Sequence, residues 1–143
     1  KDFIRSIPDY PKKGILFRDI TTLIKDKDAF NETINQIVEK SKKFKFNKIA
    51  AIESRGFVFA SAVSYILDKP FIMLRKKNKL PADVHSVDFE LEYGTATIEV
   101  HKDSFKEKAK NQIGILGKPN AGKSTYFNAI LKGIRSHNLF TNH

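Results

Sequence analysis

Residues 48–74 read KIAAIESRGFVFASAVSYILDKPFIML. The apolar run from Lys48 to Ile52 is typical of a short buried strand, and the polar turn 53–56 ends it. Residues 57–67 then predict a helix, and residues 71–74 predict a second strand. Strands that alternate with helices are typical of an α/β fold with a mainly parallel sheet, so this stretch decides the fold class.

The flanking residues extend the same pattern. Residues 28–43 predict a helix with Asp28 as its N-cap, residues 113–116 a strand, and residues 124–134 a further helix. Alternating apolar residues between His85 and His101 predict a β-ribbon that projects as a flap, with its tip at Tyr93-Gly94. Residues 7–14 contain two prolines and a glycine, and therefore predict an extended loop.

Composition limits the classes of function. The chain has 143 residues, one domain's worth, and no cysteine, which excludes disulfides, zinc–thiolate clusters and thiol catalysis. No apolar run reaches the length of a membrane span, and the opening Lys1-Asp2-Phe3 has neither an export signal nor a methionine. We therefore expect a fragment or a trimmed form of a protein, and a cytoplasmic location. A net charge of +10 favours anionic partners, although a merely solvated basic surface explains it equally well.

Three polar loops follow predicted strands, at residues 53–56, 75–79 and 117–123. In sheets of this kind, ligands bind at the carboxyl ends of the strands. The sequence therefore predicts that the functional site lies at this edge of the sheet.

Four blocks resemble adenine phosphoribosyltransferase when taken in their order and at their spacings. They are GILFRDIT at 14–21, ESRGF at 53–57, RKKNKLP at 75–81 and ELEYGT at 90–95. The resemblance covers residues 1 to about 108 and implies a type I phosphoribosyltransferase-like fold. It also implies a homodimer that transfers a phosphoribosyl group from phosphoribosyl pyrophosphate to adenine, with Mg²⁺, giving AMP and pyrophosphate.

The resemblance also implies roles for individual residues. Residues around the adenine would be Leu16, Phe17 and Arg18. Residues that hold pyrophosphate would be Ser54, Arg55, Gly56, Arg75, Lys76 and Lys79. Glu92 and Tyr93 would lie on the loop that closes over the reaction and, with Arg75, would form the catalytic group.

The chemistry of the reaction agrees with these roles. Loss of pyrophosphate builds negative charge on the leaving group, which fixed arginines stabilise, and a glutamate can orient the attacking purine nitrogen. Plainer roles stay open: Arg55 could cap a helix or pair with Glu53, Glu92 could be a solvated charge, and Phe17 could be a core aromatic. Asn78 stands where the family usually has glycine, and asparagine tolerates a left-handed backbone better than most residues.

The resemblance stops before residues 113–128, which read IGILGKPNAGKSTYFN. This is a G-x-x-x-x-G-K-S phosphate loop between a strand and a helix, and it resembles the first motif of Obg-like and YchF-like GTPases. Ser124 would reach a Mg²⁺ ion. The predicted phosphate-binding residues are Gly117, Asn120, Ala121, Gly122, Lys123, Ser124 and Thr125. The residues after Ser124 contain neither Asp-x-x-Gly nor Asn-Lys-x-Asp, so GTP hydrolysis is not expected.

The phosphate loop can be aligned without a gap with the strand–loop–helix segment that adenine phosphoribosyltransferases have at this place. In that alignment, Gly117-Lys118 stand where the family carries two adjacent aspartates that bind the ribose hydroxyls. A lysine has no acceptor and cannot replace them. We therefore expect a single domain over residues 1–143 with a chimeric junction near residue 110. After the junction we expect a P-loop unit at 109–135 and a frayed tail at 136–143. The C-terminal part of the family's fold would be incomplete.

Three functions stay open from the sequence. The first is an impaired adenine phosphoribosyltransferase, and the second is a non-catalytic module that binds GTP, ATP or another phosphorylated ligand. The third, a nucleic-acid binder, rests on net charge alone. The chimera itself could be natural, engineered or the product of a mis-assembled gene.

Overall fold

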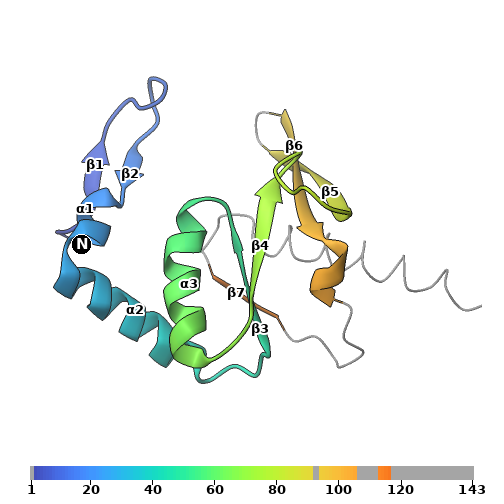
Figure 1. Cartoon of the computed structure of the whole chain (residues 1–143). Coiled ribbons are helices and arrows are strands. Elements are labelled where there is room, and N and C mark those ends of the chain that lie inside the picture. The colour runs from blue at the N-terminus through green and yellow to red at the C-terminus, as the bar shows by residue number, and fades with distance from the viewer. Residues whose placement is uncertain (1, 92–93, 106–112, 117–143) are drawn as a thin grey trace, which may run out of the picture. The chain divides into compact units, whose positions relative to one another are not determined.

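The computed structural model describes residues 2–91, 94–105 and 113–116. The chain divides into two compact units, residues 1–43 and residues 44–143 (Figure 1). The predicted helix at 124–134, the junction near residue 110 and the tail lie outside the described residues. The prediction of a single domain stays a prediction.

The N-terminal unit consists of a hairpin and two helices. Strands β1 (Arg5–Ile7) and β2 (Phe17–Asp19) pair antiparallel, so part of the predicted opening loop is a strand. Helices α1 (Thr21–Lys25) and α2 (Lys27–Ser41) follow. The loop between the strands turns at Gly14 (φ 87°), whose amide donates to Asp9 Oδ1 at 2.6 Å.

Helix α2 corrects the predicted N-cap. The side chain of Asp26, not that of Asp28, accepts a hydrogen bond from Ala29 N at 2.9 Å. An N-cap oxygen reaches the amide two or three residues further on, so two aspartates only two positions apart are both candidates for this role. The apolar spacing is confirmed, since Ile34 and Val38 are buried.

The second unit is built on a five-stranded sheet of order β5-β6-β4-β3-β7. Strands β3 (Lys48–Ile52), β4 (Phe71–Lys76) and β7 (Ile113–Leu116) are parallel, as predicted. The ribbon of β5 (Val84–Leu91) and β6 (Gly94–His101) is antiparallel, and a short 3₁₀ helix, Lys102–Phe105, follows it. The ribbon joins the sheet because β6 pairs with β4 at Arg75↔Glu99 and Lys76↔Ile98.

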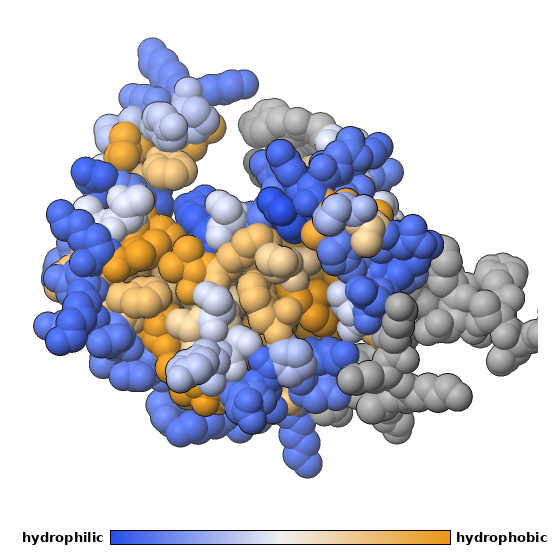
Figure 2. All heavy atoms as spheres, in the orientation of Figure 1, coloured by the Kyte–Doolittle hydropathy of each residue, from blue (hydrophilic) through white to orange (hydrophobic). Residues whose placement is uncertain are grey.

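Helix α3 (Arg55–Leu67) lies beside β3 and β4 (Figure 1). Small residues allow this close approach: a Cβ at Gly56 would stand 3.1 Å from Ala51 Cβ, and Ala51 and Ala60 are fully buried. In the view of Figure 2, apolar residues gather over α3, whereas hydrophilic residues cover the ribbon. The glycine of the ESRG block therefore has a packing role between helix and sheet.

Apolar residues of β3, β4 and the ribbon form one core cluster. It contains Ala50, Ile72, Leu74, Ile98 and Val100, with Ile52, Val87, Phe105 and Ile113 packed against it. Val87 stands directly opposite Ile98 in the ribbon, so the predicted alternation is confirmed there. Strand β7 contributes a second contact, because the Phe46 ring lies 3.2 Å from the place of a Cβ on Gly114.

None of the helices in the described part of the chain has the length and apolar character that a membrane span requires.

Candidate functional site

The carboxyl ends of β3 and β4 bring two of the predicted loops together. The strands pair in parallel from Ile49↔Phe71 to Ile52↔Leu74, and Glu53 N continues the ladder by donating to Leu74 O at 2.9 Å. Because parallel strands end at one edge of the sheet, residues 53–56 and 75–79 start side by side. The structure thus brings the backbone of these two predicted loops together, while their role as a binding site stays a prediction.

An ion pair joins these two loops. Arg75 Nε donates to Glu53 Oε2 at 2.8 Å, with the side chains 34% and 11% exposed. The hydrogen bond from Arg75 lowers the pKa of Glu53 below its ordinary value, against the effect of burial. The same guanidinium donates through Nη1 to Lys79 O at 3.1 Å, so Arg75 also fixes the far end of its own turn.

Residues 54–56 form the start of α3. Ser54 is the N-cap residue, although its side chain makes no capping bond, and the peptide bond between Glu53 and Ser54 is cis. Arg55 begins the helix and is exposed, and the first turn contains no acidic residue. A helix start whose first turn contains no acidic residue favours an anionic ligand.

The basic turn begins later than predicted. Strand β4 continues through Arg75 and Lys76, and the chain turns at Lys77 and Asn78. Lys79 N donates to Lys76 O at 3.2 Å and closes the turn. The side chains of Lys76, Lys77 and Lys79 are exposed, so the turn presents three cations beside the start of α3.

Asn78 has a left-handed backbone, with φ 62°. The substitution of asparagine for the family's glycine is therefore explained by the conformation that this turn requires.

Asn78→Val is expected to lower the free energy of unfolding by about 1–2 kcal/mol, because a β-branched residue clashes with its own backbone at positive φ. Asn78→Gly should stay within roughly 0.5 kcal/mol of the parent protein, since glycine accepts this φ at some cost in chain entropy. Urea denaturation measures both values. Equal stability of the valine and glycine variants would contradict this account of the turn.

The predicted adenine-side residues lie in the N-terminal unit. Leu16 is 51% exposed, and Phe17 is half-buried with its ring edge-on to Tyr10 at 5.1 Å between centroids. Arg18 is exposed and donates to the hydroxyl of Ser6 on the paired strand. The hairpin therefore presents an apolar side chain, an aromatic ring and a guanidinium at consecutive positions.

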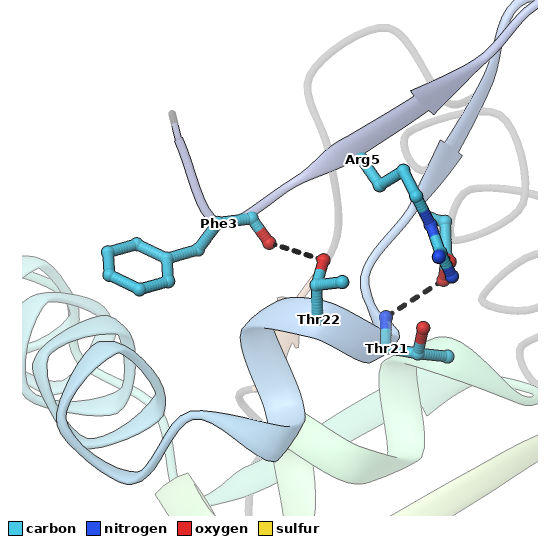
Figure 3. A network of polar contacts seen from close by, with 5 residues as sticks. Phe3, Arg5, Thr21 and Thr22 are labelled. Atoms are coloured by element: carbon cyan, nitrogen blue, oxygen red, sulfur yellow. Dashed lines mark hydrogen bonds and ion pairs between the residues drawn. The ribbon is translucent and has the colours of Figure 1, made fainter.

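Sequence reasoning missed a polar network that closes the hairpin onto α1 (Figure 3). Asp19 Oδ1 accepts from Thr21 N at 2.9 Å, and Oδ2 accepts from Arg5 Nε at 3.0 Å. The hydroxyl of Thr22 donates to Phe3 O at 2.7 Å. The amide of Thr21 and then the Arg5 guanidinium lower the pKa of Asp19 from 3.8 to about 2. The block GILFRDIT thus contains a structural aspartate next to Leu16, Phe17 and Arg18.

This network predicts an acid-sensitive contribution to stability. A carboxyl group whose pKa is lowered by folding stabilises the protein above its unfolded pKa, and this contribution disappears as the pH falls through the folded pKa. Replacement of Asp19 by Asn should therefore lower the melting temperature at pH 6, and the difference from the parent protein should shrink between about pH 4 and pH 2. Circular dichroism melts across this range measure it; a constant difference would contradict the prediction.

Several predicted site residues lie outside the described residues. These are the closing-loop pair Glu92 and Tyr93 and the phosphate loop Gly117, Asn120, Ala121, Gly122, Lys123, Ser124 and Thr125. Strand β7, which precedes the phosphate loop, is described and pairs with β3 in parallel. Residue 117 therefore follows a strand whose neighbour carries residues 53–56 at its own end.

Comparison with known proteins finds one family for most of the chain and another for a short C-terminal segment. The adenine phosphoribosyltransferase of Pelagibacter ubique is 86% identical over 104 residues, which are 73% of this chain and 59% of that protein. The chain thus spans about three fifths of the length of the curated relatives it matches. A family described as 50S ribosome-binding GTPase matches residues 112–141.

Solved structures of adenine phosphoribosyltransferases resemble this chain in fold as well. The adenine phosphoribosyltransferase of Thermoanaerobacter pseudethanolicus has 42% identity and a TM-score of 0.83, covering 94% of this chain and 77% of its own. The APRTase of Giardia lamblia, solved with 9-deazaadenine, has 33% identity and a TM-score of 0.72 over 80% of this chain and 62% of its own. These likenesses confirm the predicted type I phosphoribosyltransferase-like fold, and the chain belongs to the adenine phosphoribosyltransferase family.

Proposed function

We propose that the chain carries the adenine and pyrophosphate sites of an enzyme that converts adenine and phosphoribosyl pyrophosphate into AMP and pyrophosphate. The observation that carries the proposal is the Glu53–Arg75 pair, which holds the start of α3 and the cationic turn at one edge of the sheet. The names of the relatives support the choice of adenine as the acceptor.

In this proposal, charge on the leaving group is stabilised from two sides. The amides of residues 54–56 face the pyrophosphate from the helix start, and Arg75, Lys76 and Lys79 face it from the turn. Leu16, Phe17 and Arg18 contact adenine, and Glu92 and Tyr93 close over the reacting atoms. The family resemblance further supports a homodimer and a cytoplasmic location, both of which we propose.

Mg²⁺ is proposed to arrive with the substrate. Among residues 2–91, 94–105 and 113–116, no group of three or more acidic or histidine side chains could hold a metal ion. Mg²⁺ commonly binds through substrate phosphates and water with few protein ligands, which fits a site of this composition. Bound there, the ion would neutralise charge on the pyrophosphate, and Ser124 is its one proposed protein ligand.

We propose that transfer is slow in this chain because Gly117 and Lys118 stand in place of the ribose-binding aspartates. A second candidate function is a non-catalytic module that binds GTP or ATP phosphates through residues 117–125. This candidate rests on the short match of residues 112–141 to a GTPase family. The two functions are separable, since only the first requires phosphoribosyl pyrophosphate as a reactant.

The decisive experiment is AMP formation from labelled adenine, phosphoribosyl pyrophosphate and Mg²⁺ by the purified, folded chain. We expect slow formation of AMP that depends on both substrates, with hypoxanthine as a control base that is not converted. A folded chain that neither forms AMP nor binds phosphoribosyl pyrophosphate would refute the proposal. Binding of GTP without binding of phosphoribosyl pyrophosphate would support the second candidate instead.

A further inference from the structure

Glu99 is a charged side chain in an unexpected place. It lies on β6, directly opposite Arg75 of β4, and is only 5% exposed. Its neighbours Ile98 and Val100 are buried as well, so three consecutive residues of this strand are covered. Burial of a carboxylate is costly unless hydrogen bonds compensate it, so the partners of Glu99 indicate what it does.

Both oxygens of Glu99 have partners in neighbouring segments. Oε2 accepts from the backbone amide of Asn78 at 2.9 Å, and Oε1 lies 3.4 Å from the hydroxyl of Ser86 on β5. The bond to Asn78 is charge-assisted and therefore stronger than a bond between neutral groups. It is made at the residue whose left-handed backbone reverses the chain between Lys76 and Lys79.

The cationic turn is thus held at two points by two different segments. Arg75 binds the carbonyl of Lys79 from β4, and Glu99 binds the amide of Asn78 from the ribbon. The first bond fixes the distance between the ends of the turn. The second fixes its orientation relative to β6, the strand that leads back from residues 92–93.

We propose that Glu99 is a positioning residue that orients the turn bearing Lys76 and Lys79 by binding the Asn78 amide. The inference rests on the proposed function, because that function assigns pyrophosphate binding to Lys76 and Lys79. Glu99 touches neither substrate in this proposal and acts only through the backbone of the turn. Its loss should therefore weaken the binding of phosphoribosyl pyrophosphate and leave the contacts of adenine with residues 16–18 unchanged.

The test compares the parent chain with three full-length variants. Glu99→Ala removes the acceptor, and Glu99→Gln keeps an acceptor oxygen without the charge. Thr97→Ala is the matched control, since it breaks a bond of the same ribbon, from Thr97 Oγ1 to Asp88 Oδ1 at 2.6 Å, that does not reach the turn. Hydrogen exchange of the Asn78 amide by NMR and calorimetric titration with phosphoribosyl pyrophosphate and Mg²⁺ are measured on each.

Glu99→Ala should expose the Asn78 amide to exchange and raise the Kd for phosphoribosyl pyrophosphate about ten- to hundredfold, the range of one charge-assisted hydrogen bond. Glu99→Gln should restore part of both losses, and Thr97→Ala should change neither. If Glu99→Ala does not fold, Glu99→Gln decides the question with a smaller change of the same sign.

Two results would overturn the inference. Unchanged protection of Asn78 would mean that Glu99 does not hold the turn. Lost protection with unchanged Kd would mean that the orientation of the turn does not govern binding. If the parent chain itself does not bind phosphoribosyl pyrophosphate, the proposed function fails, while the exchange of Asn78 still tells whether Glu99 holds the turn.

Discussion

Replacement of Gly117 and Lys118 by aspartate is expected to raise the rate of AMP formation by about two to four orders of magnitude. Two carboxylates would accept hydrogen bonds from the ribose hydroxyls, and charged hydrogen bonds contribute roughly 1.5–3 kcal/mol each. The measurement is kcat/KM for phosphoribosyl pyrophosphate with saturating adenine. Leu116, the last residue of β7, pairs with Ala51 of β3, and β3 ends at Ile52 just before residues 53–56. We therefore expect carboxylates placed directly after β7 to join the existing site.

The matched control is the asparagine pair at the same positions. Its amides have nearly the shape of aspartate but lack the charge, so the gain in rate should be much smaller. The aspartate pair should also weaken GTP binding, because it removes the first glycine of the predicted phosphate loop and introduces two negative charges that repel phosphate. A folded aspartate variant with unchanged transfer would refute our proposal that the missing aspartates slow the reaction.

Arg75→Ala is expected to reduce AMP formation by about 10²–10³-fold, the usual loss when one fixed donor to developing negative charge is removed. It should also lower the free energy of unfolding by roughly 1–3 kcal/mol, because the nearly buried Glu53 carboxylate loses its partner. Arg75→Lys should recover part of the activity, since it restores the charge without the planar fork. Steady-state kinetics and urea denaturation measure the two effects.

The double variant Glu53→Gln with Arg75→Ala separates the two roles of Arg75. A neutral glutamine tolerates the lost partner better than a carboxylate, so most of the stability should return. The activity should not return, because no cation faces the leaving group from position 75. Recovery of activity together with stability would show that Arg75 is needed only for folding.

The sheet could be predicted from the sequence because its signals are local. Apolar runs of strand length at residues 48–52, 71–74 and 113–116 are short and bounded by polar turns, and each is a strand. The left-handed conformation of Asn78 was also predictable, since few other residues tolerate it. The exact element ends were less predictable: the N-cap of α2 and the last residues of β4 both differ from the prediction.

The contacts that organise the site could not be predicted in the same way. Glu53 and Arg75 meet because β3 and β4 pair in one particular register, and Glu99 meets Asn78 because β6 lies next to β4. Alternation along the ribbon places Glu99 on the face opposite that of Ile98 and Val100, and it does not tell whether that face is covered. Its burial is a consequence of strand order, which local patterning does not contain.

The parallel pairing of β7 with β3 bears on how much sequence change this strand tolerates. The ladder from Lys48↔Ile113 to Ala51↔Leu116 is made of main-chain groups, which are the same in every protein. A strand at this position therefore needs only residues of acceptable size and polarity, such as the apolar Ile113 against the core and a glycine at 114 that leaves room for the Phe46 ring. The sequence of this strand can thus vary widely without any change to the pairing that holds it in the sheet.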